Sequence, residues 1–187
     1  MKPQLVMLAG PNGAGKTTFY ELFLKATTLP LVNADRMVAA FQLEAYEAAK
    51  VADVIRREYL QRGASFVTET VFSDPVGDKL NFLREAVAMG CEVRLIYIGL
   101  ASPMLAQARV AFRVAQGGHA VPDEKVAARY QRSLKNLAQA LSFVPSVTIY
   151  DNSLANPPYR LVAEVKDGKV VRRQKGKLPG WAPGIIG

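Results

Sequence analysis

Short apolar runs alternate with amphipathic segments along most of the chain. An apolar run bounded by turn residues is typical of a buried strand, and apolar positions with the helical period indicate a helix that buries one face. Runs of the first kind predict strands at Gln4–Ala9, Leu29–Asn33, Ser65–Thr70, Glu92–Leu100 and Ser146–Tyr150.

The segments between these runs have the helical pattern. Ser102-Pro103 and Ser73-Asp74-Pro75 are typical helix starts, because short polar side chains cap the first turn and proline fits its first position. Helices are therefore predicted at Gly15–Lys25, 36–62, Ser73–Gly90 and Ser102–Gln116, and from Pro122 through Leu141. The alternation of strands and helices predicts a three-layer α/β/α fold, in which a mostly parallel sheet of about five strands has helices on both faces.

The pattern changes after Asp151. Tyr159–Val165 and Lys169–Arg173 flank Asp167-Gly168, a pair that favours a hairpin turn. The last fourteen residues are basic and rich in glycine and proline, and they are predicted to be irregular. We therefore expect residues 1–155 to form one α/β domain and residues 156–187 to form a C-terminal β-hairpin appendage with a basic tail.

A glycine-rich segment lies between the first predicted strand and the helix that follows it. Glycines let backbone N–H groups surround a phosphate, and the N-terminus of the helix adds further donors. We expect this phosphate loop to bind a nucleoside triphosphate, with Lys16 on the β- and γ-phosphates, Thr17 on Mg²⁺ and Thr18 on the α-phosphate. The loop reads Gly10, Pro11, Asn12, Gly13, Ala14, Gly15, Lys16 and Thr17, and it fits the pattern G-x-x-x-x-G-K-[ST].

Candidate residues for the phosphate acceptor follow the second and third predicted strands. Ligands of open α/β sheets bind beyond the carboxyl ends of the strands, where Asp35, Glu69 and Thr70 stand. Asp35 is a candidate general base for a hydroxyl, although it could equally be a helix N-cap. Glu69 lies among apolar residues, where a carboxylate is costly unless it is paired or faces a site. Because no apolar strand ends in the aspartate that usually assists the metal, Asp35 or Glu69 would take that part.

Four arginines lie on two predicted helices that a glycine-containing loop separates. Arg109 and Arg113 are on the first helix, and Arg129 and Arg132 are on the second. This arrangement resembles the helical lid of small kinases, so we expect Arg113 and Arg129 to stabilise the transferring phosphate. Solvated surface charges are the alternative. His119, in the loop between the helices, is either a loop residue that packs or caps, or a catalytic group.

The motifs together resemble the zeta-toxin family of P-loop kinases. The resemblance covers roughly residues 4–153, and its specificity comes from the order of the motifs, since many families share the phosphate loop. Members of the family use ATP and Mg²⁺ to phosphorylate the sugar 3′-hydroxyl of UDP-N-acetylglucosamine, and an antitoxin protein commonly holds them in check. The motifs are Gly10–Thr18, Asn33-Ala34-Asp35, Glu69-Thr70, Leu95–Leu100, Arg113 with Gly117-Gly118-His119-Ala120-Val121-Pro122, Arg129-Tyr130 with Ser133-Leu134 and Asn136-Leu137, and Tyr150-Asp151-Asn152-Ser153.

The resemblance implies a role for each matching residue. The chain lacks the longer substrate-binding insertions of the large toxins, so UDP-N-acetylglucosamine itself is not implied as firmly as the phosphoryl transfer. The expected acceptor is a nucleotide sugar or another small metabolite. A metabolic or antibiotic-detoxifying kinase is the alternative. Arg109 or Arg132 could substitute for one of the two lid arginines, because the spacing between such arginines varies in the family. The matched positions are Asp35 for the catalytic base, Lys16 for the phosphate-loop lysine, Glu69 and Thr70 for the region that contacts the substrate sugar, Arg113 and Arg129 for the arginines on the transferring phosphate, and Asp151–Ser153, which includes Asn152, for the turn beside the adenine.

The composition sets limits on partners and location. The chain has 187 residues, with 24 lysines and arginines against 16 acidic residues, and its net charge of +8 favours polyanionic partners. The basic residues 172–177 motivate the alternative of a nucleic-acid-binding protein, which the lack of interleaved aromatic residues disfavours. The single cysteine, Cys91, excludes an internal disulfide, and no apolar stretch is long enough for a membrane span. We expect a cytoplasmic protein that does not bind membranes.

Overall fold

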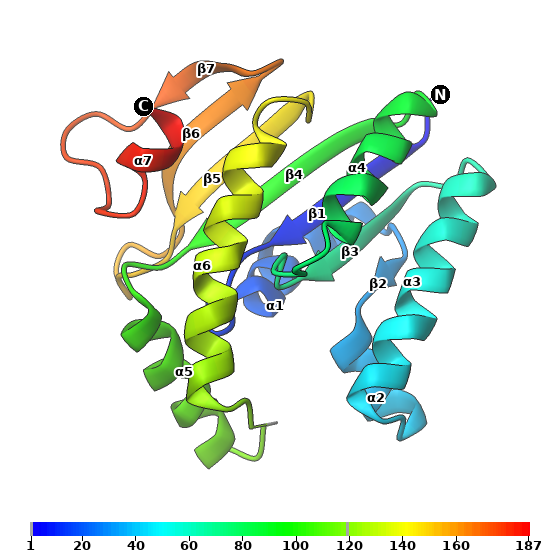
Figure 1. Ribbon diagram of the computed structural model, residues 1–187, viewed down its shortest axis with the longest axis horizontal. Coiled ribbons are helices and arrows are strands. Elements are labelled where there is room, and N and C mark those ends of the chain that lie inside the picture. Colours follow the sequence, from blue (N-terminus) through cyan, green and yellow to red (C-terminus); the bar gives the residue numbers. More distant parts are fainter. Residues whose placement is uncertain (1, 119) are drawn as a thin grey trace.

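In the part of the chain that the structure describes, residues 2–118 and 120–187, one mixed sheet of seven strands forms the middle layer. The computed structural model has the strand order β2-β3-β1-β4-β5-β6-β7 (Figure 1). The first five of these run parallel, and β6 and β7 are antiparallel to their neighbours. The strands are β1 (Gln4–Ala9), β2 (Leu31–Val32), β3 (Phe66–Thr70), β4 (Glu92–Gly99), β5 (Ser146–Asp151), β6 (Arg160–Lys166) and β7 (Lys169–Arg173).

The parallel strands are those that the apolar runs predict, and the α/β class is confirmed. β1 lies between β3 and β4, and its residues from Leu5 to Ala9 are all buried. A central parallel strand with helices on both faces is apolar throughout, which is why β1 and β4 stand out as continuous runs. β2 differs most from its prediction, because only Leu31–Val32 pairs with β3.

The C-terminal hairpin is part of the sheet and not an appendage to it. β6 pairs with β5 along the whole of β5, so the prediction of about five strands is wrong by the two strands of this hairpin. Without β6, the strand β5 would present unpaired backbone groups at an edge, and β6 satisfies them while it buries Val162, Ala163 and Val165. The predicted turn at Asp167-Gly168 is confirmed, and both residues have the positive φ (47° and 76°) that such a turn requires.

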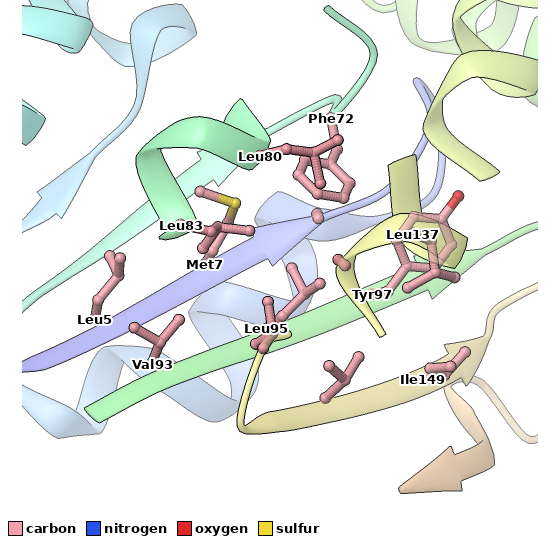
Figure 2. Close-up of a cluster of buried hydrophobic side chains, with 14 of the residues drawn as sticks. Leu5, Met7, Phe72, Leu80, Leu83, Val93, Leu95, Tyr97, Leu137 and Ile149 are labelled. Carbon is pink, nitrogen blue, oxygen red and sulfur yellow. The ribbon is translucent and has the colours of Figure 1, made fainter. Parts of the chain in front are cut away.

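Helices cover both faces of the sheet (Figure 1). On one face α3, α4 and α6 pack against β1, β4 and β5, where Figure 2 shows Leu83 of α4 and Leu137 of α6 in one cluster with Met7. On the other face α1, η1 and α5 pack around Leu8 and Ile98. Across the described ranges, none of the helices combines the length and apolar character that crossing a membrane requires. The helices are α1 (Lys16–Phe19), the π-helical η1 (Tyr20–Leu24), the 3-10 helix η2 (Lys25–Thr27), α2 (Ala34–Phe41), α3 (Ala45–Gln61), α4 (Asp78–Ala88), α5 (Pro103–Ala115), α6 (Asp123–Ala140) and α7 (Pro183–Ile186).

Two helix predictions need correction. The predicted helix over 36–62 is two helices, because Gln42 ends α2 in the left-handed conformation (φ 54°) before α3 begins. The predicted start at Ser73-Asp74-Pro75 is wrong, because α4 begins only at Asp78 with Gly77 as its N-cap. The predicted start of α5 is confirmed, since Ser102 Oγ accepts a hydrogen bond from the backbone N–H of Leu105 at 3.1 Å.

The segment between β3 and α4 is held by the side chains of α6 instead of forming a helix. Arg132 Nε donates to the carbonyl oxygen of Ser73 at 2.8 Å, and Asn136 Nδ2 donates to that of Phe72 at 3.1 Å. Phe72 itself has a positive φ of 60°, so the chain turns at this point. These contacts bind the backbone carbonyls that a helix would otherwise use, and they keep the segment beside the carboxyl end of β3.

The tail that follows β7 packs on the sheet. Leu178, Trp181 and Ala182 are buried in the same cluster as β4 and β5, and α7 follows them. The Trp181 ring lies directly over Gly99, where a Cβ atom would come within 2.2 Å of a ring carbon. Trp181 Nε1 also donates to Asp151 Oδ1 at 3.0 Å. The expectation of an irregular basic tail therefore misses its buried apolar residues and its short helix.

Candidate active site

The phosphate loop turns tightly between β1 and α1. Gly10 has a φ of 144°, and a Cβ atom there would lie 2.2 Å from the carbonyl oxygen of Ile98 in β4. Gly15 has a φ of 86° and is the residue directly before α1. Only glycine accepts these conformations and approaches without strain. The loop therefore leads directly into the N-terminus of α1, where unpaired N–H groups favour an anion.

Lys16 is buried and reaches back across the loop. Its Nζ donates to the carbonyl oxygen of Pro11 at 3.1 Å. Burial lowers the pKa of Lys16 from its ordinary value, and the negative charges of Glu69 and Asp35 oppose that shift. The buried ammonium group thus donates to the loop and lies within the electrostatic influence of two carboxylates.

Glu69 lies beside the hydroxyl of Thr17. Thr17 Oγ1 donates to the Glu69 carboxylate, at 3.2 Å from Oε1 and 3.3 Å from Oε2. Asn33 Nδ2 donates to Glu69 Oε2 at 2.7 Å. Glu69 therefore stands on the side of the loop where Mg²⁺ binds in P-loop enzymes, and it could assist the metal as well as contact the acceptor.

Asn33 is part of the Asn33-Ala34-Asp35 motif, but the sequence alone assigned it no role of its own. Its Oδ1 accepts a hydrogen bond from the backbone N–H of Arg36 at 3.2 Å, so Asn33 and not Asp35 is the N-cap of α2. The preference of asparagine for N-caps was the available signal. Because Asp35 is in the first turn of α2 without capping it, its carboxylate is available to the cleft that it lines.

A cleft of about 1070 Å³ opens where these elements meet. It brings together both carboxylates, the phosphate loop and the arginines of the predicted lid. Gly10, Pro11, Ala14 and Asn152 are buried below its surface. The predicted residues that line it are Asn12, Gly13, Gly15, Lys16, Thr17, Thr18, Asp35, Glu69, Thr70, Arg113 and Arg129.

The four arginines of α5 and α6 all line the cleft. Arg109 lies across the turn after β5, with its guanidinium donating to Gly13 O at 3.5 Å and to Ser153 O at 3.4 Å. Arg132 holds the loop after β3, as described above. Arg113 lies on α5 and Arg129 on α6. His119, between the helices, lies outside the described residues.

Asn152 supports the phosphate loop from below. Its Nδ2 donates to the carbonyl oxygen of Ala14 at 2.9 Å, and its Oδ1 accepts from the backbone N–H of Tyr159 at 3.3 Å. The Tyr159 hydroxyl donates to the carbonyl oxygen of Gly15 at 2.9 Å. Tyr159 gave no signal in the sequence, because its contact joins segments far apart in the chain. Both side chains fix the shape of the loop from β5 and the start of β6.

The site has oxygen donors that fit Mg²⁺ bound with a triphosphate. Within residues 2–118 and 120–187, no group of three or more His, Cys, Asp or Glu side chains is arranged to hold a metal ion. Magnesium in P-loop enzymes is held by a Ser or Thr hydroxyl and by phosphate oxygens, with carboxylates assisting. The Thr17 hydroxyl beside the Glu69 carboxylate is a donor set of this kind.

Comparisons with known proteins agree with this geometry. The model of the AAA domain family matches residues 5–137. A comparison with the curated proteins gave no match. Among solved structures, the PezAT chromosomal toxin-antitoxin system of Streptococcus pneumoniae is similar, with 15% identity and a TM-score of 0.64 over 99% of this chain and 78% of that chain.

Complexes of AvrRxo1-ORF1 with AvrRxo1-ORF2 are similar as well. The native complex has 16% identity and a TM-score of 0.70 over 97% of this chain and 66% of that chain. The complex with ATP has 17% identity and a TM-score of 0.65 over 90% of this chain and 60% of that chain. At these identities the solved structures show a common fold, while the family match spans most of the chain. The protein therefore belongs to the AAA domain family, and it shares its fold with the PezAT and AvrRxo1 structures.

Proposed function

We propose that the protein transfers the γ-phosphate of ATP to a hydroxyl group of a small molecule. The observation that supports this is the meeting of a phosphate loop and an acceptor side in one cleft. Lys16 of the loop is close enough to Glu69 and Asp35 for both carboxylates to raise its pKa against the effect of burial. A transferring phosphate held by Lys16 would therefore face a candidate base directly.

The nucleotide would bind along the phosphate loop. Backbone N–H groups of the loop and of the start of α1 surround the phosphates, and Lys16 neutralises charge on the β- and γ-phosphates. The Thr17 hydroxyl and the Glu69 carboxylate beside it would hold Mg²⁺. When bound, the ion neutralises charge on the phosphates. One of the similar structures, an AvrRxo1 complex, contains ATP. Arg109 and the turn after Asn152 would lie next to the adenine end of the nucleotide.

Asp35 would accept the proton of the acceptor hydroxyl. Its place in the first turn of α2, which Asn33 caps, fixes its direction relative to the loop. Arg113 and Arg129 would approach the transferring phosphate from the lid helices and stabilise the charge that spreads over its oxygens. Closure of α5 and α6 over the cleft would exclude water, which otherwise competes with the acceptor hydroxyl.

Asp35→Asn tests the central role. General-base removal typically lowers the rate by roughly a hundredfold to ten-thousandfold, whereas the phosphate loop is untouched. We expect transfer from radiolabelled ATP into a metabolite extract to fall by that amount, with the affinity for ATP nearly unchanged. Glu44→Gln, an exposed carboxylate close to the same helix, is the matched control. Full turnover by Asp35→Asn would remove Asp35 from this role.

Nucleotide sugars such as UDP-N-acetylglucosamine are the first acceptors to test, and other small metabolites or antibiotics are the alternative. A toxin of this kind would slow growth when expressed, and a co-expressed antitoxin protein would relieve it. The similar PezAT structure belongs to a toxin-antitoxin system. Growth inhibition by the wild type, absent for Lys16→Ala, would support the toxin branch. Normal growth with a phosphorylated metabolite would leave a metabolic kinase.

A further inference from the structure

The acceptor side of the cleft is lined by two cations to which the proposed reaction gives no role. They are Arg56 of α3 and Lys79 of α4. Arg56 is only 5% exposed, and its Nη1 donates to Thr68 Oγ1 at 3.2 Å. Thr68 directly precedes Glu69 in β3. The guanidinium therefore lies beside β3, next to the position of Glu69.

Arg56 and Lys79 share a single carboxylate. Lys79 Nζ lies 2.6 Å from Asp53 Oδ1, and Arg56 Nη2 pairs with the same oxygen. Although partial burial alone would raise the pKa of Asp53, the hydrogen bonds from Lys79 and Arg56 lower it, so Asp53 stays ionised at neutral pH. Two positive charges are then balanced by one negative charge. These three side chains together carry a net positive charge, and the two cations are 6% and 17% exposed.

Glu69, Asp35 and Asp74 also line the cleft. Glu69 binds Thr17 and Asn33, and Asp35 faces Lys16. The Asp74 carboxylate oxygens are buried and, among the residues that the structure describes, have no hydrogen-bond partner, so neither Arg56 nor Lys79 donates to them. Lys79 has three N–H donors, and its contact with Asp53 uses one of them. The cluster can therefore offer both donors and charge to an anion.

We propose that Arg56 and Lys79 form an anion subsite for the acceptor, so that the acceptor carries a carboxylate or a phosphate group as well as its hydroxyl. This inference rests on the proposed kinase function, since it concerns the acceptor side of the same cleft. It favours sugar acids, sugar phosphates and nucleotide sugars. It disfavours neutral polyols, which have no anionic group for the subsite to bind, and polycationic antibiotics, which its positive charge would repel.

Binding of inorganic phosphate tests the subsite without any turnover. The protein is first saturated with a non-hydrolysable ATP analogue and Mg²⁺, which fills the phosphate loop, and phosphate is then titrated in a calorimeter. Lys79→Met removes one charge-assisted contact and should weaken phosphate binding about tenfold. Asp53→Asn removes the internal competitor for both cations and should strengthen binding several-fold.

The control variant is Arg57→Met. Arg57 pairs with Glu85 at 2.9 Å and so ties α3 to α4 as Asp53 and Lys79 do. It borders a small pocket beside Asp53 and Lys79 but does not line the cleft itself. A merely structural cluster would give unchanged phosphate binding in all three variants, or weaker binding in Asp53→Asn. Either result would overturn the subsite.

A panel of acceptors completes the test and separates the two proposals. ATP consumption is measured with a sugar acid, a sugar monophosphate, UDP-N-acetylglucosamine, a neutral sugar alcohol and an aminoglycoside. We expect turnover of an anionic acceptor only, with a higher KM for it in Lys79→Met and little change in kcat. Preferred turnover of the neutral or cationic compound would overturn the subsite. Phosphate binding that responds to Lys79 and Asp53, without phosphorylation of any acceptor in the panel or in a metabolite extract, would keep the subsite and overturn the kinase function.

Discussion

Asn33 joins two parts of the proposed active site through the two ends of one side-chain amide. Its oxygen caps α2, the helix that carries Asp35, and its nitrogen holds Glu69 beside Thr17. Asn33→Ala removes both contacts. Asn33→Ser keeps a side-chain oxygen that can cap the helix but is too short to reach Glu69, so the two variants separate the contributions.

The expected magnitudes follow from the two bonds. Loss of an N-cap costs about 1 kcal/mol. Loss of a hydrogen bond to a charged group costs about 1.5 kcal/mol, the lower end of the usual range, because the Glu69 carboxylate faces an open cleft. Asn33→Ala should therefore lower the free energy of unfolding by roughly 2.5 kcal/mol and Asn33→Ser by roughly 1.5 kcal/mol.

Urea unfolding at neutral pH, with the m-value checked for constancy, measures both changes. Because Glu69 loses a donor in each variant, both should also need a higher Mg²⁺ concentration for half-maximal ATP turnover. Equal stabilities for the Ala and Ser variants would refute the capping role. A change below about 0.5 kcal/mol in both would refute the reasoning that the amide links α2 to Glu69.

Two further predictions concern buried side chains. Because burial lowers the pKa of Lys16 below 10.5, its charge disfavours folding at neutral pH, and this penalty fades as the pH rises from the folded-state pKa toward 10.5. Lys16→Met should therefore raise the Tm of the nucleotide-free protein at neutral pH, and raise it by less at alkaline pH. The same variant should abolish the Tm increase that ATP causes. A lower Tm of the variant at neutral pH would contradict this reasoning. Trp181→Phe keeps a ring over Gly99 but leaves the buried Asp151 without that donor, and should cost about 1–3 kcal/mol in urea unfolding. Trp181→Ala also opens a cavity and should cost about 3–5 kcal/mol, so equal losses in the two variants would argue against separate packing and hydrogen-bond contributions.

The local signals in the sequence predicted the parallel strands and the phosphate loop. Buried parallel strands such as β1 are apolar throughout, and the loop needs glycine at positions such as Gly10, where β4 passes within van der Waals distance. In both cases the required residue types stand close together in one segment of the chain, so they leave a pattern in the sequence. The turn at Asp167-Gly168 was predictable for the same reason.

Contacts between distant segments were not predictable in this way. Nothing in the tail itself indicates that Trp181 packs over Gly99, because the requirement is on a glycine in another strand. The predicted cap at Ser73-Asp74-Pro75 failed because Arg132 and Asn136 of α6 hold that segment. In both places a tertiary contact overrides the local preference.

The bond from Asn152 to the loop has a consequence for how the protein folds. It joins residues 138 positions apart in the chain, so the loop receives this support only after the intervening strands and helices have been brought together. Long-range contacts of this kind form slowly and late. Early folding intermediates should therefore bind nucleotide weakly, although they contain every residue of the phosphate loop. Nucleotide should accordingly slow unfolding of the whole domain, since it binds the assembled sheet and not the loop segment alone.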